Sequence, residues 1–275
     1  MKTIVVIPAR FASERFPGKP LKRLSVDGSQ KSLIKRSWEA ACKVKNVEEV
    51  IVATDDGRIR IEAESFGARV VMTSKECKNG TERCAEALEL INIDCDIVVN
   101  FQGDAPLTPD WFVEDLLHVF KENADTEIAT PVLRLDGVSL NNLKLDRNHG
   151  LVGGTTVVFD NDFNALYFSK EIIPYFDEKR LKESANFPIF QHVGVYAYRS
   201  KTLLNYNSWK ESNLEVLEGL EQLRFLENGC SIKCVLVDSK GRTFWELNNP
   251  EDVERIEKAI NENMSKLKTP KNIYR

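Results

Sequence analysis

The sequence lacks several features that would assign it to common functional classes. No apolar stretch approaches the length of a membrane span, and the short apolar run after Met1-Lys2 is too brief for a signal-peptide core. The formal net charge is only −4, and basic residues are interleaved with acidic ones, which argues against binding nucleic acid by phosphate neutralisation. We therefore expect a cytoplasmic protein with neither a membrane nor a nucleic-acid partner.

Cysteine and histidine are sparse and unpatterned. Six cysteines form no paired framework, which favours reduced, structural thiols. Cys230 and Cys234 have three residues between them rather than two, with no histidine nearby, which argues against a zinc site. The sequence also contains no Ser-His-Asp or Cys-His arrangement, so it does not predict a protein nucleophile.

The 275 residues, 42% of them hydrophobic, are enough for one sizeable core. In the first half, strand-like and helix-like patterns alternate, which predicts an α/β fold with a doubly wound, mostly parallel sheet and a ligand crevice at the carboxyl ends of its strands. The expected strands are Thr3–Ile7, Glu49–Thr54, Arg69–Met72 and Ile97–Phe101, and the expected helices are Leu33–Lys45, Arg58–Phe66 and Thr81–Leu90.

From about residue 125 to 200 the pattern changes to longer strands and hairpins, which predicts an inserted β-hairpin subdomain that caps the crevice or forms an oligomer contact. Its expected strands are Glu127–Leu135, Thr155–Phe159, Ala165–Phe168 and Gln191–Tyr198. We then expect one helix over Leu214–Asn228, a strand over Ile232–Val237 and a helix from Pro250 with Asn249 as N-cap. The whole reads as a single domain over residues 1–265 with a polar tail over 266–275.

The loop after the first strand carries three cations. Arg10, Arg15 and Lys19 follow a buried strand, and Pro17-Gly18 forms a turn that holds the lysine near the strand's end. Such a loop favours a polyphosphate ligand, because guanidinium and ammonium groups pair with phosphate oxygens. It is not a Walker A loop, since the upstream glycine is missing and Pro20 follows the lysine. The alternative is a loop whose charges are simply solvated.

A carboxylate follows the fourth expected strand, at Gln102-Gly103-Asp104. Asp104 would face the basic loop, where Mg²⁺ is commonly held by one or two carboxylates together with substrate phosphates. The alternative is an aspartate that begins a turn before Ala105-Pro106.

Several blocks together resemble the 3-deoxy-manno-octulosonate (Kdo) cytidylyltransferases, or CMP-Kdo synthetases, and the resemblance covers about residues 3–260. Each block is weak by itself, but the combination is highly specific. In the first half the blocks are Ile7-Pro8-Ala9-Arg10 with Pro17-Gly18-Lys19-Pro20, Val52-Ala53-Thr54-Asp55-Asp56, Gly80-Thr81-Glu82-Arg83 and Asn100-Phe101-Gln102-Gly103-Asp104. In the second half they are Ala165-Leu166-Tyr167-Phe168-Ser169, His192-Val193-Gly194-Val195-Tyr196, Leu220-Glu221-Gln222-Leu223-Arg224 and Asn249-Pro250-Glu251-Asp252.

The resemblance implies a Rossmann-like nucleotidyltransferase fold and a homodimer joined through the insertion. The implied reaction joins CTP to a 2-keto-3-deoxy sugar acid, Kdo or a variant, with Mg²⁺, and gives a CMP-sugar and pyrophosphate for lipopolysaccharide or other surface polysaccharide synthesis. No covalent protein intermediate is needed, because positioning, cations and the metal stabilise the charge on phosphorus.

The resemblance also implies a set of site residues. Lys19, Arg10 and Asp104 would be catalytic, and Ala9, Ser13 and Arg15 would help Arg10 and Lys19 hold the triphosphate. The cytidine would contact Asn79, Gly80, Thr81 and Arg83, and Gln102 would lie at the reacting centre. The sugar acid would contact Lys170, His192, Tyr196, Glu221 and Gln222. Without the resemblance, Tyr196 could equally be a packed aromatic and Glu221 an exposed helical charge.

The sequence departs from the family pattern at the acceptor and metal positions. Ala105 replaces a glutamate, Lys170 replaces an arginine, and the run Val152–Val158 differs, so the identity of the acceptor is open. Asn248 replaces the aspartate that would join Asp104 on the metal, which predicts weaker Mg²⁺ binding unless Glu246 supplies the missing carboxylate. Two alternatives remain: a sugar-1-phosphate nucleotidyltransferase, and a nucleotide-binding paralogue without catalysis.

Overall fold

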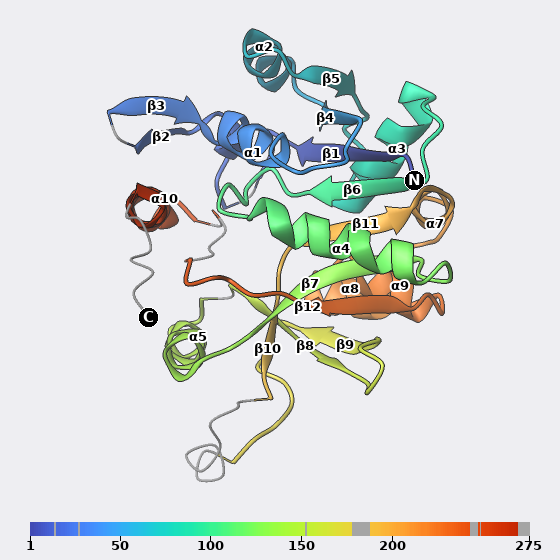
Figure 1. Cartoon of the computed structure of the whole chain (residues 1–275), viewed down its shortest axis with the longest axis vertical. Coiled ribbons are helices and arrows are strands. Elements are labelled where there is room, and N and C mark those ends of the chain that lie inside the picture. The colour runs from blue at the N-terminus through green and yellow to red at the C-terminus, as the bar shows by residue number, and fades with distance from the viewer. Residues whose placement is uncertain are drawn as a thin grey trace, which may run out of the picture.

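The computed structural model describes residues 1–13, 15–26, 28–151, 153–177, 188–242, 247 and 249–268, with side chains up to residue 263. A mixed ten-stranded sheet runs through it in the order β5-β4-β1-β6-β11-β7-β10-β8-β9, with β12 beside β7 (Figure 1). The strands are β1 (Thr3–Ala9), β4 (Glu49–Thr54), β5 (Arg69–Met72), β6 (Ile97–Phe101), β7 (Ile128–Arg134), β8 (Thr155–Phe159), β9 (Ala165–Ser169), β10 (Phe190–His192), β11 (Val195–Arg199) and β12 (Ile232–Leu236).

Helices cover both faces of the parallel strands β5, β4, β1 and β6. One face packs against α1 (Leu33–Ala41), α2 (Gly57–Ser65) and α4 (Asp110–Glu122), and the other against α3 (Gly80–Ile91), α7 (Ser200–Tyr206) and α9 (Leu223–Glu227). In β1, Val5 and Ile7 enter the first core and Ile4 and Val6 the second, all fully buried. Burial on both faces explains why this strand reads as a continuous apolar run, and the doubly wound α/β fold is confirmed.

The other half of the sheet is mainly antiparallel and, apart from β12, is built from the segment expected as an insertion. There, β11 pairs with both β6 and β7, and β10 pairs with β7 and β8. The expectation of one strand over Gln191–Tyr198 is wrong. The chain bulges at Val193-Gly194, and the register against β7 shifts by two residues, from His192 opposite Val132 to Ala197 opposite Ala129. The bulge lies where this strand exchanges its outer partner β6 for β8.

The single helix expected over Leu214–Asn228 is also wrong. The structure has α8 (Asn213–Glu218) and α9, separated by Gly219–Gln222. Gly219 ends α8 in a left-handed conformation with φ of 61°, and its N–H donates to the Glu215 carbonyl at 2.7 Å. Glycine is the residue that adopts this conformation without steric cost. After the break, the Glu221 carboxylate reaches Gln102, which follows β6, and the first turn of α3.

We expect Gly219→Ala to lower the free energy of unfolding by about 1–2 kcal/mol, since a left-handed backbone costs that much for an L-residue with a side chain. The added Cβ would also lie 2.8 Å from the Lys170 ammonium nitrogen, so the flexible lysine side chain would have to move. Urea denaturation measures the change, and Gly57→Ala, at a helical glycine with open space around its Cβ position, is the matched control. Equal midpoints for the two variants would contradict the expectation.

Other elements were not expected from sequence. They are α4, α7, α5 (Gly137–Asn148), the short 3-10 helix η1 (Lys19–Leu21) and the hairpin β2 (Arg23–Val26) with β3 (Ser29–Ser32). The last helix, α10 (Asp252–Lys268), begins two residues after the expected Pro250 and packs beside β2, where Glu257 accepts from the Ser25 N–H at 2.6 Å. Of the expected polar tail, residues 266–268 are helical and 269–275 lie outside the described residues.

Candidate active site

A cleft of about 1370 Å³ opens at the carboxyl ends of β1 and β6 and the N-terminal end of α3. It extends past the end of β7 to α5, so both halves of the sheet contribute to it. The site residues expected from sequence that line it are Ala9, Arg10, Ser13, Arg15, Lys19, Asn79, Gly80, Arg83, Gln102, Asp104, Lys170, His192, Tyr196, Glu221 and Gln222. Thr81 is fully buried and is not part of the lining. Asn248 and Glu246 lie outside the described residues.

Where the basic loop lines the cleft, it places the Lys19 ammonium group beside the Asp104 carboxylate. The Lys19 Nζ lies 2.5 Å from Asp104 Oδ2 and donates to the Leu247 carbonyl at 2.9 Å. The two charged side chains are only 14% and 25% exposed. Gly18 has φ of 71° and packs on the Phe11 ring, so the turn before Lys19 needs glycine. A phosphate at this loop would compete with Asp104 for the ammonium group.

The donor set around Asp104 is compatible with Mg²⁺ carried by a polyphosphate. Within the described ranges, no group of three or more His, Cys, Asp or Glu side chains is placed to hold a metal by itself. Mg²⁺ does not require such a group, since it commonly combines one or two carboxylates with substrate phosphates and water. Asp104 lines the cleft beside the cationic loop and can serve as that carboxylate.

The N-terminus of α3 is closed by the protein's own side chains. Asn79 caps the helix by accepting from the Glu82 N–H at 2.8 Å. In the first turn of this helix, the Thr81 N–H donates to Glu221 Oε2 at 3.0 Å. The Thr81 hydroxyl contacts the Tyr198 hydroxyl at 3.1 Å. A helix N-terminus attracts anions. The Glu221 carboxylate already occupies this helix end, so it would repel a phosphate group there.

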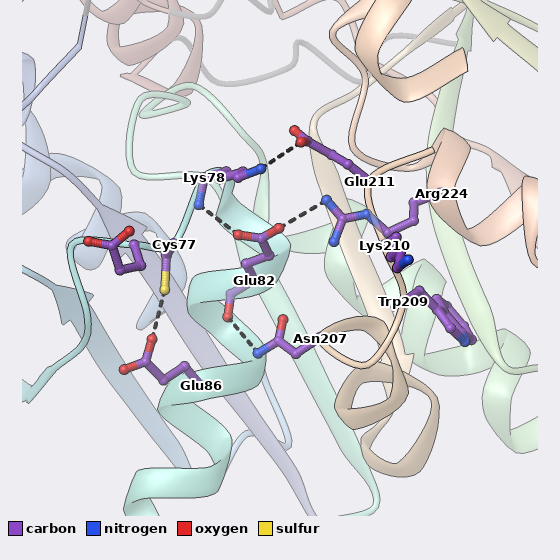
Figure 2. A pocket seen from close by; sticks show the side chains of 10 residues that line it. Cys77, Lys78, Glu82, Glu86, Asn207, Trp209, Lys210, Glu211 and Arg224 are labelled. Carbon is purple, nitrogen blue, oxygen red and sulfur yellow. Dashed lines mark hydrogen bonds and ion pairs between the residues drawn. The ribbon is translucent and has the colours of Figure 1, made fainter. Parts of the chain in front are cut away.

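Behind this helix end lies a buried ion-pair network that sequence reasoning did not identify. Arg224, 3% exposed, forks onto both oxygens of Glu215 at 2.6 and 2.7 Å and reaches Glu82 at 2.9 Å. Figure 2 shows Glu82 between Arg224 and the backbone of Lys78, in a second cavity of about 540 Å³. Asn79 joins this network because its Nδ2 donates to Glu215 Oε1 at 3.2 Å. Arg224 thereby fixes the wall that carries Asn79.

Arg83, expected in the nucleotide pocket, is 2% exposed. Its guanidinium contacts the Thr73 hydroxyl at 2.5 Å and lies 3.5 Å from Asp55 Oδ1. These contacts join the end of β4 to the loop before α3, so Arg83 shapes that corner of the cleft.

On the far side of the cleft, Lys170 and Gln222 present donors. Burial, followed by the nearby Arg15 charge, lowers the pKa of Lys170. Gln222 is 2% exposed, and its Nε2 has no hydrogen-bond acceptor among the described residues. An unpaired buried donor is costly, which favours a ligand acceptor at this position.

His192 is a buried neutral side chain. It is 7% exposed, its Nε2 lies 2.9 Å from the Thr130 hydroxyl, and its ring contacts Phe168 and Tyr196. Burial lowers its pKa from 6.5 to about 3. The imidazole is therefore uncharged near neutral pH and offers hydrogen bonding and packing, not a titrating acid.

We expect His192 to make stability depend on pH. The unfolded chain takes up its proton near pH 6.5 and the folded protein near pH 3, so the stability due to the neutral ring is complete above about 6.5 and is lost as pH falls toward 3. Urea denaturation between pH 7 and 4 gives the dependence of the free energy of unfolding on pH. This free energy should fall less steeply with falling pH in His192→Asn than in wild type, by the equivalent of up to one bound proton. Parallel slopes would contradict the buried neutral ring.

A cationic loop and a carboxylate facing a wide cleft at the ends of parallel strands define a nucleotide-binding α/β protein. A family model described as cytidylyltransferase matches residues 4–232. The chain is 41% identical to a 3-deoxy-manno-octulosonate cytidylyltransferase of Maricaulis maris, over 94% of this chain and 97% of that one. It is 37% identical to an 8-amino-3,8-dideoxy-manno-octulosonate cytidylyltransferase of a Shewanella species, over 94% and 99%.

A solved structure of CMP:2-keto-3-deoxy-manno-octonic acid synthetase complexed with CTP superposes with a TM-score of 0.79 at 33% identity, covering 96% of this chain and all of the other. The chain belongs to the cytidylyltransferase family, and the resemblance seen in its motifs is confirmed. No helix among the described residues is long and apolar enough to cross a membrane.

Proposed function

We propose that the protein transfers CMP from CTP to a 2-keto-3-deoxy sugar acid, Kdo or a variant of it, and releases pyrophosphate. The observation that carries this proposal is the pairing of Lys19 with Asp104 in a cleft lined on its far side by Lys170, His192 and Gln222. The first pair suits a metal-bound triphosphate, and the second group suits a polyhydroxy acid. Relatives that are named for Kdo and for its 8-amino analogue support both forms of acceptor.

In this reaction the oxygen of the anomeric hydroxyl of the sugar acid forms a bond to the α-phosphorus and gives up its proton to solvent, as the bond to pyrophosphate breaks. Negative charge grows on the phosphoryl and leaving oxygens, so fixed cations accelerate the step. Lys19, Arg10 and Arg15, with Ser13 and the backbone of Ala9, hold the triphosphate in this scheme. Asn79, Gly80 and the corner made by Thr81 and Arg83 adjoin the cytidine.

The acceptor would be held by the donors on the far side of the cleft. Lys170, with Arg15 near it, supplies positive charge for the carboxylate, and Gln222 supplies its unpaired N–H. His192 and Tyr196 pack against each other at 5.2 Å between ring centroids and form an apolar wall for the sugar.

Mg²⁺ would bind between Asp104 and the triphosphate and neutralise charge on the phosphates. With Asp104 as the carboxylate placed for it among the described residues, we expect Asp104→Asn to raise the Mg²⁺ concentration needed for half-maximal pyrophosphate release, or to abolish the activity. A Mg²⁺ titration of wild type and variant measures this. An unchanged requirement would remove Asp104 from the metal site.

The deciding experiment is a matrix of CTP, UTP and GTP against Kdo, 8-amino-3,8-dideoxy-manno-octulosonate and a sugar 1-phosphate, followed by pyrophosphate release. We expect release with CTP and a keto acid. Release with the sugar 1-phosphate alone would favour the alternative transferase, and CTP binding without release from any pair would favour a paralogue that only binds nucleotide.

We also propose a homodimer in the cytoplasm, whose product supplies surface polysaccharide or lipopolysaccharide synthesis. The dimer proposal is supported by the edge strand β9, which exposes Leu166 (63%), and by the 93% exposed Tyr175 beyond it. The compartment is supported by six unpaired thiols. Light scattering on the purified protein tests the dimer, and a monomeric mass at micromolar concentration would contradict it.

A further inference from the structure

The Glu221 carboxylate holds two groups at the floor of the cleft. Its Oε2 accepts from the Thr81 N–H at 3.0 Å, and its Oε1 accepts from Gln102 Nε2 at 3.2 Å. Both carboxylate oxygens of Glu221 act as acceptors in these contacts, whereas one end of an amide donates and the other accepts. Glu221 therefore decides which end of the Gln102 amide points toward it and which end is left over.

The leftover end is a hydrogen-bond acceptor. With its nitrogen turned to Glu221, Gln102 has its carbonyl oxygen free, and no donor reaches this oxygen from the described part of the chain. Gln102 lines the cleft, as does Tyr196 on the neighbouring strand β11. The free carbonyl is thus available to a ligand on the acceptor side.

Packing leaves the amide little room to move. A Cβ at position 80 would lie 2.9 Å from Gln102 Nε2, 3.3 Å from its Oε1 and 3.4 Å from a Pro8 ring carbon. The Gln102 amide therefore packs against Gly80, the first residue of α3, where any side chain would collide with it. This packing limits the movement of the amide group, and the hydrogen bond to Glu221 determines which end of the amide faces the carboxylate.

We propose that Glu221 is a positioning residue that fixes the Gln102 amide so that its carbonyl oxygen accepts a hydrogen bond from a hydroxyl group of the sugar acid. This rests on the proposed function. Gln222, the next residue, offers an unpaired buried N–H to the same cleft. One acceptor and one donor match a hydroxyl group, which both donates and accepts.

The test is Glu221→Gln. The new side chain keeps a carbonyl for the Thr81 N–H but turns an N–H toward Gln102, whose amide must then reverse and present a donor to the cleft. The fold keeps its hydrogen bonds, so the melting temperature should stay close to that of wild type. With CTP, Mg²⁺ and Kdo, we expect the KM for Kdo to rise roughly 5- to 150-fold, the range that corresponds to an unmade buried hydrogen bond of about 1–3 kcal/mol, with the KM for CTP nearly unchanged.

A double exchange restores the original polarity. In Glu221→Gln combined with Gln102→Glu, the carboxylate at 102 accepts from the amide at 221 and keeps an acceptor oxygen facing the cleft. We expect this pair to recover most of the Kdo affinity lost in Glu221→Gln. The matched control is Glu227→Gln on α9, where an exposed carboxylate caps the Leu214 N–H at 3.1 Å outside the cleft.

The outcomes separate the two proposals. An unchanged KM for Kdo in Glu221→Gln, or a double variant no better than that single variant, overturns the positioning role and leaves the proposed function intact. Wild-type protein that releases no pyrophosphate from CTP with Kdo or its 8-amino analogue overturns both.

Discussion

Replacing Lys19 by alanine should lower kcat for pyrophosphate release roughly a hundredfold or more while the protein stays folded. A preorganised cation on a transferring phosphoryl group acts where water is scarce, and removing one such donor typically costs about 3 kcal/mol of transition-state stabilisation. Lys19, the first residue of η1, is only 14% exposed and its ammonium group contacts Asp104. Its loss also leaves that carboxylate without its partner, which adds repulsion toward phosphates.

Lys22→Ala is the matched control, because it removes the same charge from an exposed lysine one turn away that does not line the cleft. Steady-state rates at saturating CTP and Mg²⁺ compare the two variants. If Lys19→Ala turned over at the wild-type rate, the basic loop would not be where the phosphates react.

Replacing Arg224 by methionine should lower the free energy of unfolding by about 3–5 kcal/mol. The substitution leaves the carboxylate of Glu215, a residue 6% exposed, without its guanidinium, and an uncompensated buried charge costs about that much. The Asn79 amide and the Tyr206 hydroxyl remain beside Glu215 at 3.2 and 3.3 Å and limit the loss. Arg224→Lys should cost less, since it keeps the charge but not the fork.

Urea denaturation gives the measurement, with Lys78→Met as control. That change breaks the Lys78–Glu211 pair on the wall of the same cavity, whose side chains are 62% and 39% exposed, and such exposed pairs contribute about 1 kcal/mol or less. A small loss in Arg224→Met would mean that Glu215 is protonated or well solvated in the fold.

Sequence periodicity was sufficient for the parallel half of the sheet. Three of its strands, Glu49–Thr54, Arg69–Met72 and Ile97–Phe101, match β4, β5 and β6 residue for residue, because each is a short run rich in apolar residues between polar loops. The break at Gly219 was missed, since the apolar spacing of Leu214, Leu217 and Leu220 continues across it. One left-handed glycine outweighs a helical repeat.

Motifs located the cleft lining, but not the state of each side chain. The ion pair of Lys19 with Asp104 and the capture of Gln102 by Glu221 join residues that are 85 and 119 positions apart in the chain. No local pattern encodes such contacts, because they depend on which loop ends the sheet topology brings together. The Mg²⁺ site, the dimer and the individual substrate contacts stay predictions.

The position of β11 between β6 and β7 has a consequence during synthesis. The edge of β6 finds its partner only after Val195–Arg199 has left the ribosome, long after β1, β4 and β5 are available. Until then the nascent chain presents the unpaired edge of a strand that is apolar at four of its five positions, and such an edge is a template for intermolecular pairing. Chaperone dependence and aggregation of ribosome-stalled fragments should therefore peak for chains that are long enough to expose β6 outside the ribosome but too short to expose β11.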